Sequence, residues 1–379
     1  MTTRTITLGF IPLTDAAMLI AAREKGFAED EGLVLDLVRE TSWANIRDRV
    51  AIGHFAAAHM LAPMALAGSL GLPPLPVAIA APMALGCGRN GMTVSAALWR
   101  ELESHGPVGH ADPLAALRAA SAGRERPLVF AAVHPYSAHA YLLRYWLAAG
   151  GLQLGRDIQL EIIPPPFMVD ALKSGRIDGF CVGEPWSTVA TAQGAGQILT
   201  TSGEIWPYGP DKVLGFRQDW AESHPAEVLA LIRALYRAAL WCEEAGNASE
   251  LARIMSANAY LGAPAELLLP GLSGAFAARA QTMQGTGFTR GHATFPWPSH
   301  AVWFLTQMAR WGQVELTAQT IAQVRATYRP ELFRAALRDF PGAAPEGDDR
   351  VEAGEIGFFD GIAFDPADPA AYLRALPRP

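Results

Sequence analysis

One segment near the middle of the chain, 164–186, constrains the fold more than any other. Three consecutive prolines at its start exclude a helix there, because each lacks a backbone N–H and fixes φ. An amphipathic helix is predicted over 167–174, and Gly175 is suited to end it in the left-handed conformation. The apolar run 177–182 predicts a buried strand that delivers the Glu-Pro-Trp sequence at 184–186 to its carboxyl end. Ligands of open α/β sheets bind outside such strand ends, so a carboxylate and an indole there indicate a small-molecule site.

The rest of the chain alternates predicted strands and helices, which is typical of an α/β protein. Asp15 is predicted to cap a helix over 16–25, and 54–67 is predicted to form a buried helix. The β-α-β order implies parallel strands joined by right-handed crossovers. Strands are predicted over four further apolar runs, 5–13, 33–38, 77–84 and 128–133.

A chain of 379 residues is too long for one ordinary hydrophobic core, so two α/β lobes are expected. Residues 1–92 and 214–379 are assigned to lobe I, and 93–213 to lobe II. The last forty residues are rich in Pro, Gly, Asp and Ala, and apolar side chains are predicted to hold this segment on the surface. These side chains are Phe358, Phe359, Phe364, Tyr372 and Leu373.

The charge of the chain argues against direct nucleic-acid binding. The formal net charge is −7, and no dense Lys/Arg run opposes it. The stretch 50–88 has no Lys, Arg, Asp or Glu before Arg89, but prolines and glycines interrupt it, so no membrane span is predicted. Any anion must therefore be held by a few local donors against an unfavourable overall charge.

The expected location is the cytoplasm. The three cysteines stand at wide spacings that match no metal motif and no disulfide framework, which suits a reducing compartment. The first predicted strand begins at Thr5, and no basic region, apolar stretch or cleavage site precedes it.

The sequence 86–91, Gly-Cys-Gly-Arg-Asn-Gly, matches the dinucleotide-binding fingerprint. It follows a predicted strand, and Asp112 lies at about the required distance of 20 residues. A dinucleotide-dependent enzyme is therefore an alternative hypothesis. However, the fingerprint usually opens the first β-α-β unit, and Asp112 precedes a proline as a helix N-cap does. A Gly-rich crossover between the lobes is the favoured interpretation.

Several segments resemble the nitrate- and bicarbonate-binding proteins that serve ABC transporters, and they occur in the same order. Together with the opening 9–15 and the closing elements at 358–366, the resemblance covers nearly the whole chain. The segments are 42–48 (Ser-Trp-Ala-Asn-Ile-Arg-Asp), 134–139 with 144–151, 164–186, and 205–207 with 211–215.

This resemblance implies a two-lobed fold of the periplasmic-binding-protein type (type II), with the ligand in the cleft between the lobes. In the relatives that bind nitrate, five positions line the ligand pocket. They correspond here to Trp43, His139, Pro165, Val182 and Lys212.

The chemistry of nitrate fits three of these residues. Nitrate is planar and singly charged, so its site needs positive charge, in-plane donors and a flat wall. Lys212 offers an ammonium, His139 offers ring N–H groups, and Trp43 offers an indole face and N–H. Taken singly, a tryptophan is more often core and a lysine more often solvated, so only the joint match favours a site.

Two further candidates are Asn90 and Glu184. Asn90 takes the place of an amide-bearing contact in the transporter relatives. Glu184 is unfavourable beside an anion and is expected to pair with Lys212 or His139, or to face away. The bicarbonate-binding relatives carry an acid near Lys212 that is used with a cation, so a lysine favours nitrate or nitrite. No metal and no cofactor is expected.

The resemblance also implies a role. The chain is similar to cytoplasmic nitrate/nitrite sensors, in which the ligand-free protein sequesters an RNA-binding antiterminator of the ANTAR type and the ligand releases it. No enzyme is expected, because no nucleophile triad, carboxylate pair or metal cluster with usable spacing is found. The alternatives are a solute-binding component of a nitrate/bicarbonate ABC transporter and a receptor for another solute, such as a sulfonate or a pyrimidine precursor.

Overall fold

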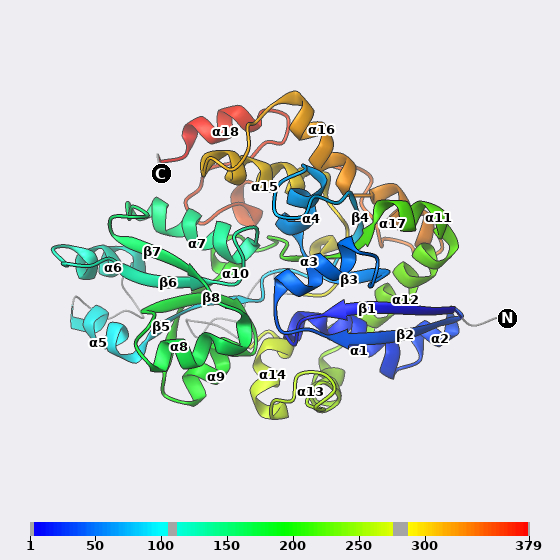
Figure 1. Ribbon diagram of the computed structural model, residues 1–379, viewed down its shortest axis with the longest axis horizontal. Coiled ribbons are helices and arrows are strands. Elements are labelled where there is room, and N and C mark those ends of the chain that lie inside the picture. Colours follow the sequence, from blue (N-terminus) through cyan, green and yellow to red (C-terminus); the bar gives the residue numbers. More distant parts are fainter. Residues whose placement is uncertain (1–3, 105–111, 276–286, 378–379) are drawn as a thin grey trace.

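The computed structural model describes residues 4–104, 112–275 and 287–377. It contains two five-stranded sheets side by side, each covered by helices (Figure 1). The first sheet has the order β2 (Leu33–Arg39), β1 (Arg4–Phe10), β3 (Ala57–Leu61), β10 (Lys212–Arg217), β4 (Ile79–Ala84). The second has the order β7 (Ile158–Ile162), β6 (Leu128–Ala132), β8 (Gly179–Gly183), β5 (Asn90–Ser95), β9 (Gly196–Thr201).

Both sheets are mixed, whereas the sequence pattern predicts parallel strands only. In the first sheet β1 is parallel to β2 and β3, but β10 is antiparallel to β3 and β4. In the second sheet β6 is parallel to β7 and β8, but β5 is antiparallel to β8 and β9. The antiparallel strands β5 and β10 are those by which the chain enters each sheet from the other one, so they do not belong to a β-α-β unit.

The helices that follow the strands bury their apolar faces on the sheets. The first half contains η1 (Thr14–Ala16), α1 (Ala17–Glu24), α2 (Phe27–Asp30), α3 (Trp43–Ala51), α4 (Ala62–Ser69), α5 (Ala96–Ser104), α6 (Pro113–Ser121), α7 (Ala138–Ala149), η2 (Pro165–Phe167), α8 (Met168–Lys173), α9 (Trp186–Ala192) and α10 (Ser202–Ile205). The remainder contains α11 (Gln218–Ser223), α12 (Pro225–Glu243), η3 (Ala245–Asn247), α13 (Ala248–Met255), α14 (Ala265–Ser273), η4 (Arg290–His292), α15 (Pro298–Arg310), α16 (Ala318–Thr327), α17 (Pro330–Ala336), η5 (Gly354–Ile356) and α18 (Pro369–Ala375).

The helix predicted over 54–67 is wrong in its first half. Residues 57–61 form β3, which is buried between β1 and β10, and only then does α4 begin. A short apolar run suits a buried strand and a buried helix equally well, so periodicity cannot distinguish them. Pro63 lies at the first turn of α4, where its missing N–H costs nothing, and it marks the true start of the helix.

The Gly-rich segment is a crossover between the sheets. It joins β4 of the first sheet to β5 of the second, and a second crossover over 202–211 returns the chain to β10. The lobe boundaries predicted at 92/93 and 213/214 cut through β5 and β10. Asn90 and Gly91 lie in a strand, whereas the dinucleotide fingerprint must open a helix. Asp112 caps α6, and its carboxylate accepts from the Leu114 amide at 3.0 Å.

The C-terminal segment joins the two halves of the molecule. Helix α15 packs on α4, which follows β3 of the first sheet, and on α7, which follows β6 of the second sheet (Figure 1). Phe358, Phe364 and Tyr372 are buried as predicted, whereas Phe359 is exposed. Within the described residues, every helix is too short or too polar to span a bilayer.

Candidate functional site

The predicted site residues lie at the carboxyl ends of the parallel strands. Trp43 opens α3 after β2, where the Ser42 hydroxyl caps the helix by accepting from the Asn45 amide at 3.2 Å. His139 lies in the first turn of α7 after β6, and Ser137 caps that helix in the same way. Lys212 begins the antiparallel strand β10 and therefore lies at the carboxyl end of β3. Both sheets thus present side chains to the same region.

Lys212 is fully buried and bound by two carboxylates. Its Nζ donates to Asp15 Oδ2 at 2.7 Å and also to Asp211 Oδ2. Burial opposes the charged amine, but both carboxylates raise the pKa of Lys212 above its usual value. Burial also opposes the charged form of Asp15 and would raise its pKa, but the positive charge of Lys212 and the neighbouring His59 bring this pKa below its ordinary value. Lys212 is therefore charged, and its charge is already matched by acids.

Two buried imidazoles flank this ion cluster. His59 Nε2 lies 3.0 Å from Asp15 Oδ1, and His139 Nε2 lies 3.6 Å from Asp211 Oδ2. Burial lowers the pKa of His139 to about 4, and the nearby Asp211 offsets this only in part. The His139 ring is therefore neutral at pH 7 and carries one N–H.

Trp43 covers the cluster with its ring. Its ring centroid lies 5.5 Å from Lys212 Nζ and 5.4 Å from the His59 ring, and the side chain is 1% exposed. Its Nε1 has no hydrogen-bond partner among the described residues. An indole N–H normally finds a partner when it is buried, so this donor is free for a ligand.

Unpartnered buried polar atoms accumulate at this cluster. In the described part of the chain, no hydrogen-bond partner is found for either ring nitrogen of His139, for His59 Nδ1 or for Asn90 Oδ1. Most buried polar atoms in proteins are paired, so such a concentration is typical of a site for a polar ligand or for water. We name Asp15, Trp43, His59, His139, Asp211 and Lys212 the Lys212 cluster.

Of the remaining candidates, Asn90 lies beside the cluster. A Cβ built on Gly183 would come within 3.5 Å of both Asn90 Oδ1 and Asp15 Oδ2. Val182 precedes Gly183 at the buried end of β8. Pro165 is buried at the start of η2, which follows the carboxyl end of the edge strand β7.

Glu184 is held by its own helix. It accepts from the Thr188 hydroxyl and from the Thr188 amide at 3.4 Å, at the N-terminus of α9. Of the expected arrangements, pairing with Lys212 or His139 is therefore wrong. Burial raises the pKa of Glu184 to about 7, so this carboxyl adds less negative charge near an anion than an ordinary glutamate.

Three members of the cluster escape sequence reasoning as site residues: Asp15, His59 and Asp211. Asp15 is predicted as a helix cap, but α1 begins at Ala17 without a side-chain cap, and the carboxylate turns to Lys212 instead. His59 falls in the segment mistaken for helix. Asp211 directly precedes Lys212, and this Asp-Lys pair is the only local signal that the lysine is neutralised.

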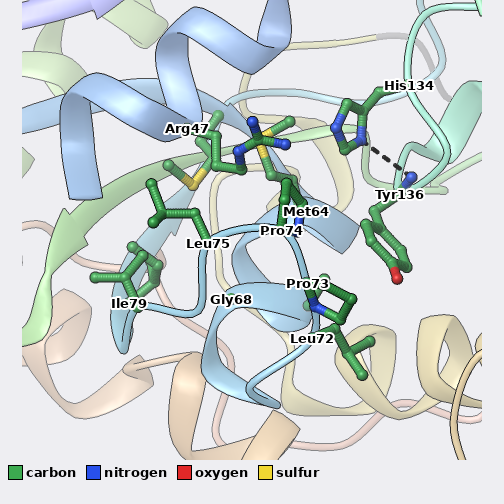
Figure 2. Close-up of a pocket in the computed structure, with 13 residues that line it drawn as sticks. Arg47, Met64, Gly68, Leu72, Pro73, Pro74, Leu75, Ile79, His134 and Tyr136 are labelled. Atoms are coloured by element: carbon green, nitrogen blue, oxygen red, sulfur yellow. Dashed lines mark hydrogen bonds between the residues drawn. The ribbon is translucent and has the colours of Figure 1, made fainter. Parts of the chain in front are cut away.

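A separate pocket lies between the proline-rich loop after α4 and the segment after β6 (Figure 2). Figure 2 shows His134 and Tyr136 on one side, with Met64 and Pro73 opposite. Its walls are mainly apolar, and its one cation, Arg47, is paired with Asp48 at 2.7 Å. Burial lowers the pKa of His134 to about 4, so it is neutral at pH 7. This pocket does not suit an anion.

The Lys212 cluster suits an anion better than a metal ion. Within the described ranges, no group of three or more His, Cys, Asp and Glu side chains is arranged to hold a metal. The ammonium of Lys212 occupies the space between the two carboxylates that a cation would use.

The fold and this site define a two-lobed substrate-binding protein. A crystal structure of the periplasmic nitrate-binding protein NrtA from Synechocystis superposes with a TM-score of 0.90, at 31% identity, over 99% of this chain and 98% of that one. Residues 1–256 match the NMT1-like family, and the chain belongs to this family.

The names of the curated relatives give different anions, nitrate or nitrite in some and bicarbonate in others. The chain is 35% identical to the nitrate/nitrite binding protein NrtA of Synechococcus elongatus, over 98% of this chain and 86% of that protein. It is 30% identical to the bicarbonate-binding protein CmpA of Synechococcus sp., over 98% and 86%. It is also 36% identical to the nitrate import ATP-binding protein NrtC of Synechocystis, of which it spans only about half, 54%.

Proposed function

We propose that this chain is a binding protein, not an enzyme, and that it holds nitrate or nitrite at the Lys212 cluster. One observation carries the proposal: unpartnered donors from both sheets converge on a buried ammonium. Trp43 Nε1 comes from the first sheet and the His139 ring from the second, and Lys212 lies between them. The likeness to nitrate/nitrite-binding relatives supports the same ligand.

The cluster offers the interactions that a small planar anion needs. The indole supplies a flat apolar wall and an N–H, and the ammonium supplies charge and a third donor beyond the two held by Asp15 and Asp211. In a buried site, such charge-assisted hydrogen bonds are shorter and stronger than neutral ones. We infer that the anion joins the two sheets and so stabilises a closed form. A lysine at 212 favours nitrate or nitrite over bicarbonate held with a cation.

The indole N–H provides a direct test. We expect Trp43→Phe, which keeps a flat ring but removes the donor, to weaken nitrate binding about 10- to 100-fold, or about 1.5–3 kcal/mol. Isothermal titration with sodium nitrate measures this, with nitrite, bicarbonate and sulfate as competitors. Trp220→Phe is the matched control, because Trp220 lies in α11 and its ring stacks on Phe216 and His224, which are not members of the Lys212 cluster. Unchanged affinity in Trp43→Phe would remove Trp43 from the site, and absence of nitrate and nitrite binding in the parent would refute the function.

We further infer that the protein is a cytoplasmic sensor. In this role the ligand-free form sequesters an ANTAR-type RNA-binding antiterminator, and nitrate or nitrite releases it. The resemblance to nitrate/nitrite sensors supports this role, and the net charge of −7 assigns RNA contact to the partner. The likeness to NrtA and CmpA supports the alternative, a solute-binding component of an ABC transporter, equally well.

The coupling between nitrate binding and regulator binding distinguishes the sensor role from the transporter role. Each ANTAR-domain regulator of the same organism is purified and mixed with this protein, with and without sodium nitrate, and complexes are separated by size-exclusion chromatography. A sensor is expected to form a complex that nitrate dissociates, and the regulator must lower nitrate affinity by the same factor. A nitrate-binding protein that binds none of them, or binds one regardless of nitrate, would favour the transporter role.

A further inference from the structure

The charges of the Lys212 cluster do not balance for an anion. The described residues place two carboxylates, Asp15 and Asp211, on one ammonium, Lys212, so the three groups carry a formal charge of −1 before any ligand binds. An incoming anion brings this to −2 in a region where all three side chains are at least nine-tenths buried. Uncompensated buried charge is strongly unfavourable, so a positive charge must enter with the anion.

The neighbouring groups limit where that charge can go. His59 faces Asp15, and His139 faces Asp211. Cys181 on β8 is buried beside the same ion pair, and burial raises the pKa of its thiol, so it stays neutral. The guanidinium of Arg89 is engaged elsewhere, since it donates to Gly271 O at 2.6 Å and lies over Phe288.

The remaining charged neighbour is Glu184, which is bonded to Thr188. The described residues also provide no metal-binding group that would let a metal ion supply the charge. Of these described neighbours, an imidazole can become a cation at neutral pH, whereas a proton on Glu184 would only remove a negative charge from a carboxyl that already faces Thr188.

His139 is the better placed of the two. A neutral imidazole has one N–H, and its other nitrogen is a lone-pair acceptor. If Nε2–H faces Asp211, Nδ1 presents a lone pair that repels an anion. A second proton turns Nδ1 into a donor, so that the cationic ring can donate to Asp211 and to the anion at once. Burial keeps the free ring neutral, which leaves it able to take up the proton.

We propose that the anion binds together with one proton, which His139 takes up, so that the true ligand of the Lys212 cluster is an anion–proton pair. This inference rests on the proposed anion site and names its second ligand. The proton comes from solvent or buffer, and no covalent bond other than the N–H forms. His59, held near Asp15, acts as a positioning residue for that carboxylate.

Proton uptake is measured by isothermal titration with sodium nitrate at pH 6.5 in PIPES and in Bis-Tris, whose ionisation enthalpies differ. The slope of the observed binding enthalpy against the ionisation enthalpy of the buffer gives the number of protons exchanged, and we expect about one proton taken up per nitrate bound. The affinity is expected to fall about tenfold per pH unit between the pKa of the free His139, about 4, and the higher pKa of the bound His139. Nitrate binding with a slope of zero overturns the proposal and leaves the anion site intact. Absence of nitrate binding at every pH from 5.5 to 8.5 refutes both.

Variants assign the proton. His139→Asn keeps an amide N–H near Nδ1 but cannot take up a proton, so its nitrate binding, though weaker, is expected to be independent of buffer and pH. The matched control His54→Asn, at an exposed histidine, and the variant His59→Gln are expected to keep the uptake. Uptake that persists in His139→Asn, or vanishes in His59→Gln, overturns the assignment to His139. The buffer series on the unmutated protein shows by itself whether a proton is bound. The proposal can therefore be tested even if one variant folds poorly.

Discussion

Lys212→Met is expected to destabilise the protein by about 3–5 kcal/mol at pH 7, because it leaves two buried carboxylates without their cation. Asp15 and Asp211 are 4% and 5% exposed, so neither can regain its hydration without opening the structure. Nitrate binding is expected to be lost as well. Urea denaturation measures the first effect and calorimetry the second. The control Lys25→Met breaks an ion pair to Glu250 at the surface, with partly exposed side chains, and is expected to cost less than about 1 kcal/mol.

The pH dependence of this effect follows from the direction of each pKa shift. The lowered pKa of Asp15 stabilises the parent above the unfolded value of about 3.9, and the contribution disappears as pH falls through the folded pKa. The raised pKa of Lys212 stabilises it below about 10.4, and that contribution disappears as pH rises through the folded pKa. In Lys212→Met the ammonium no longer opposes the effect of burial on Asp15, so this carboxyl takes up a proton at a higher pH than in the parent. The difference in stability should therefore shrink as the pH falls towards 4.

A triple variant tests whether charge is the cause. Asp15→Asn, Asp211→Asn and Lys212→Met together remove all three charges, and most of the lost stability is expected to return. Nitrate binding should stay absent. If Lys212→Met alone were as stable as the parent, the two carboxylates could not both be ionised in the folded protein.

Glu352→Ala is expected to cost a similar amount, about 3–5 kcal/mol, since it removes a buried carboxylate from three donors. Glu352 is fully buried and accepts from Trp206 Nε1 at 3.0 Å, from Arg350 Nε at 2.8 Å and, with its proton on Nε2, from His300 at 3.0 Å. Burial would raise the pKa of Glu352, but His300 and Arg350 lower it below its ordinary value.

The destabilisation caused by Glu352→Ala should extend to the Lys212 cluster. Trp206 lies in the crossover 202–211 that leads to Asp211, and the Phe359 amide donates to Ile205 O at 2.9 Å in the same crossover. Faster hydrogen exchange is therefore expected over 202–217, together with weaker nitrate binding. The exposed Glu355→Ala is the control, and Glu352→Gln should show a smaller effect because it keeps one acceptor. Loss of stability without any change at 202–217 would show that the C-terminal segment does not position the site.

The sequence predicts most elements of this fold because their signals are local. The apolar run predicted as a strand over 128–133 forms β6, which spans Leu128–Ala132. The failures have a common cause in long-range packing. Residues 57–61 become β3 because β1 and β10 flank them, and the antiparallel direction of β10 depends on where the chain returns. Ala57 pairs with Leu8, 49 residues away, and Leu61 pairs with Lys212, 151 residues away, so these partners leave no local pattern.

The site was accessible from the sequence only in part. The binding residues carried over from the resemblance stay a prediction, although Trp43 lies over Lys212, and His139 and Lys212 both face Asp211. The acids that neutralise Lys212 were not foreseen as site residues, because Asp15 is almost two hundred residues away from its partner. A lysine in a motif indicates positive charge, and only the folded structure shows how much of that charge is already compensated.

The two crossovers divide the recognition groups unequally between the halves of the molecule. Asp15, Trp43 and Lys212 travel with the first sheet, whereas His139 travels with the second. Recombination between relatives at 85–89 and 202–211 would therefore transmit the ionic part of anion selectivity with one parent and the imidazole with the other. Hybrids of a nitrate-binding and a bicarbonate-binding protein should inherit their choice between these two anions from the parent of the first sheet. Divergence of this family towards a new anion can thus begin with substitutions in the two outer stretches of the chain that build the first sheet.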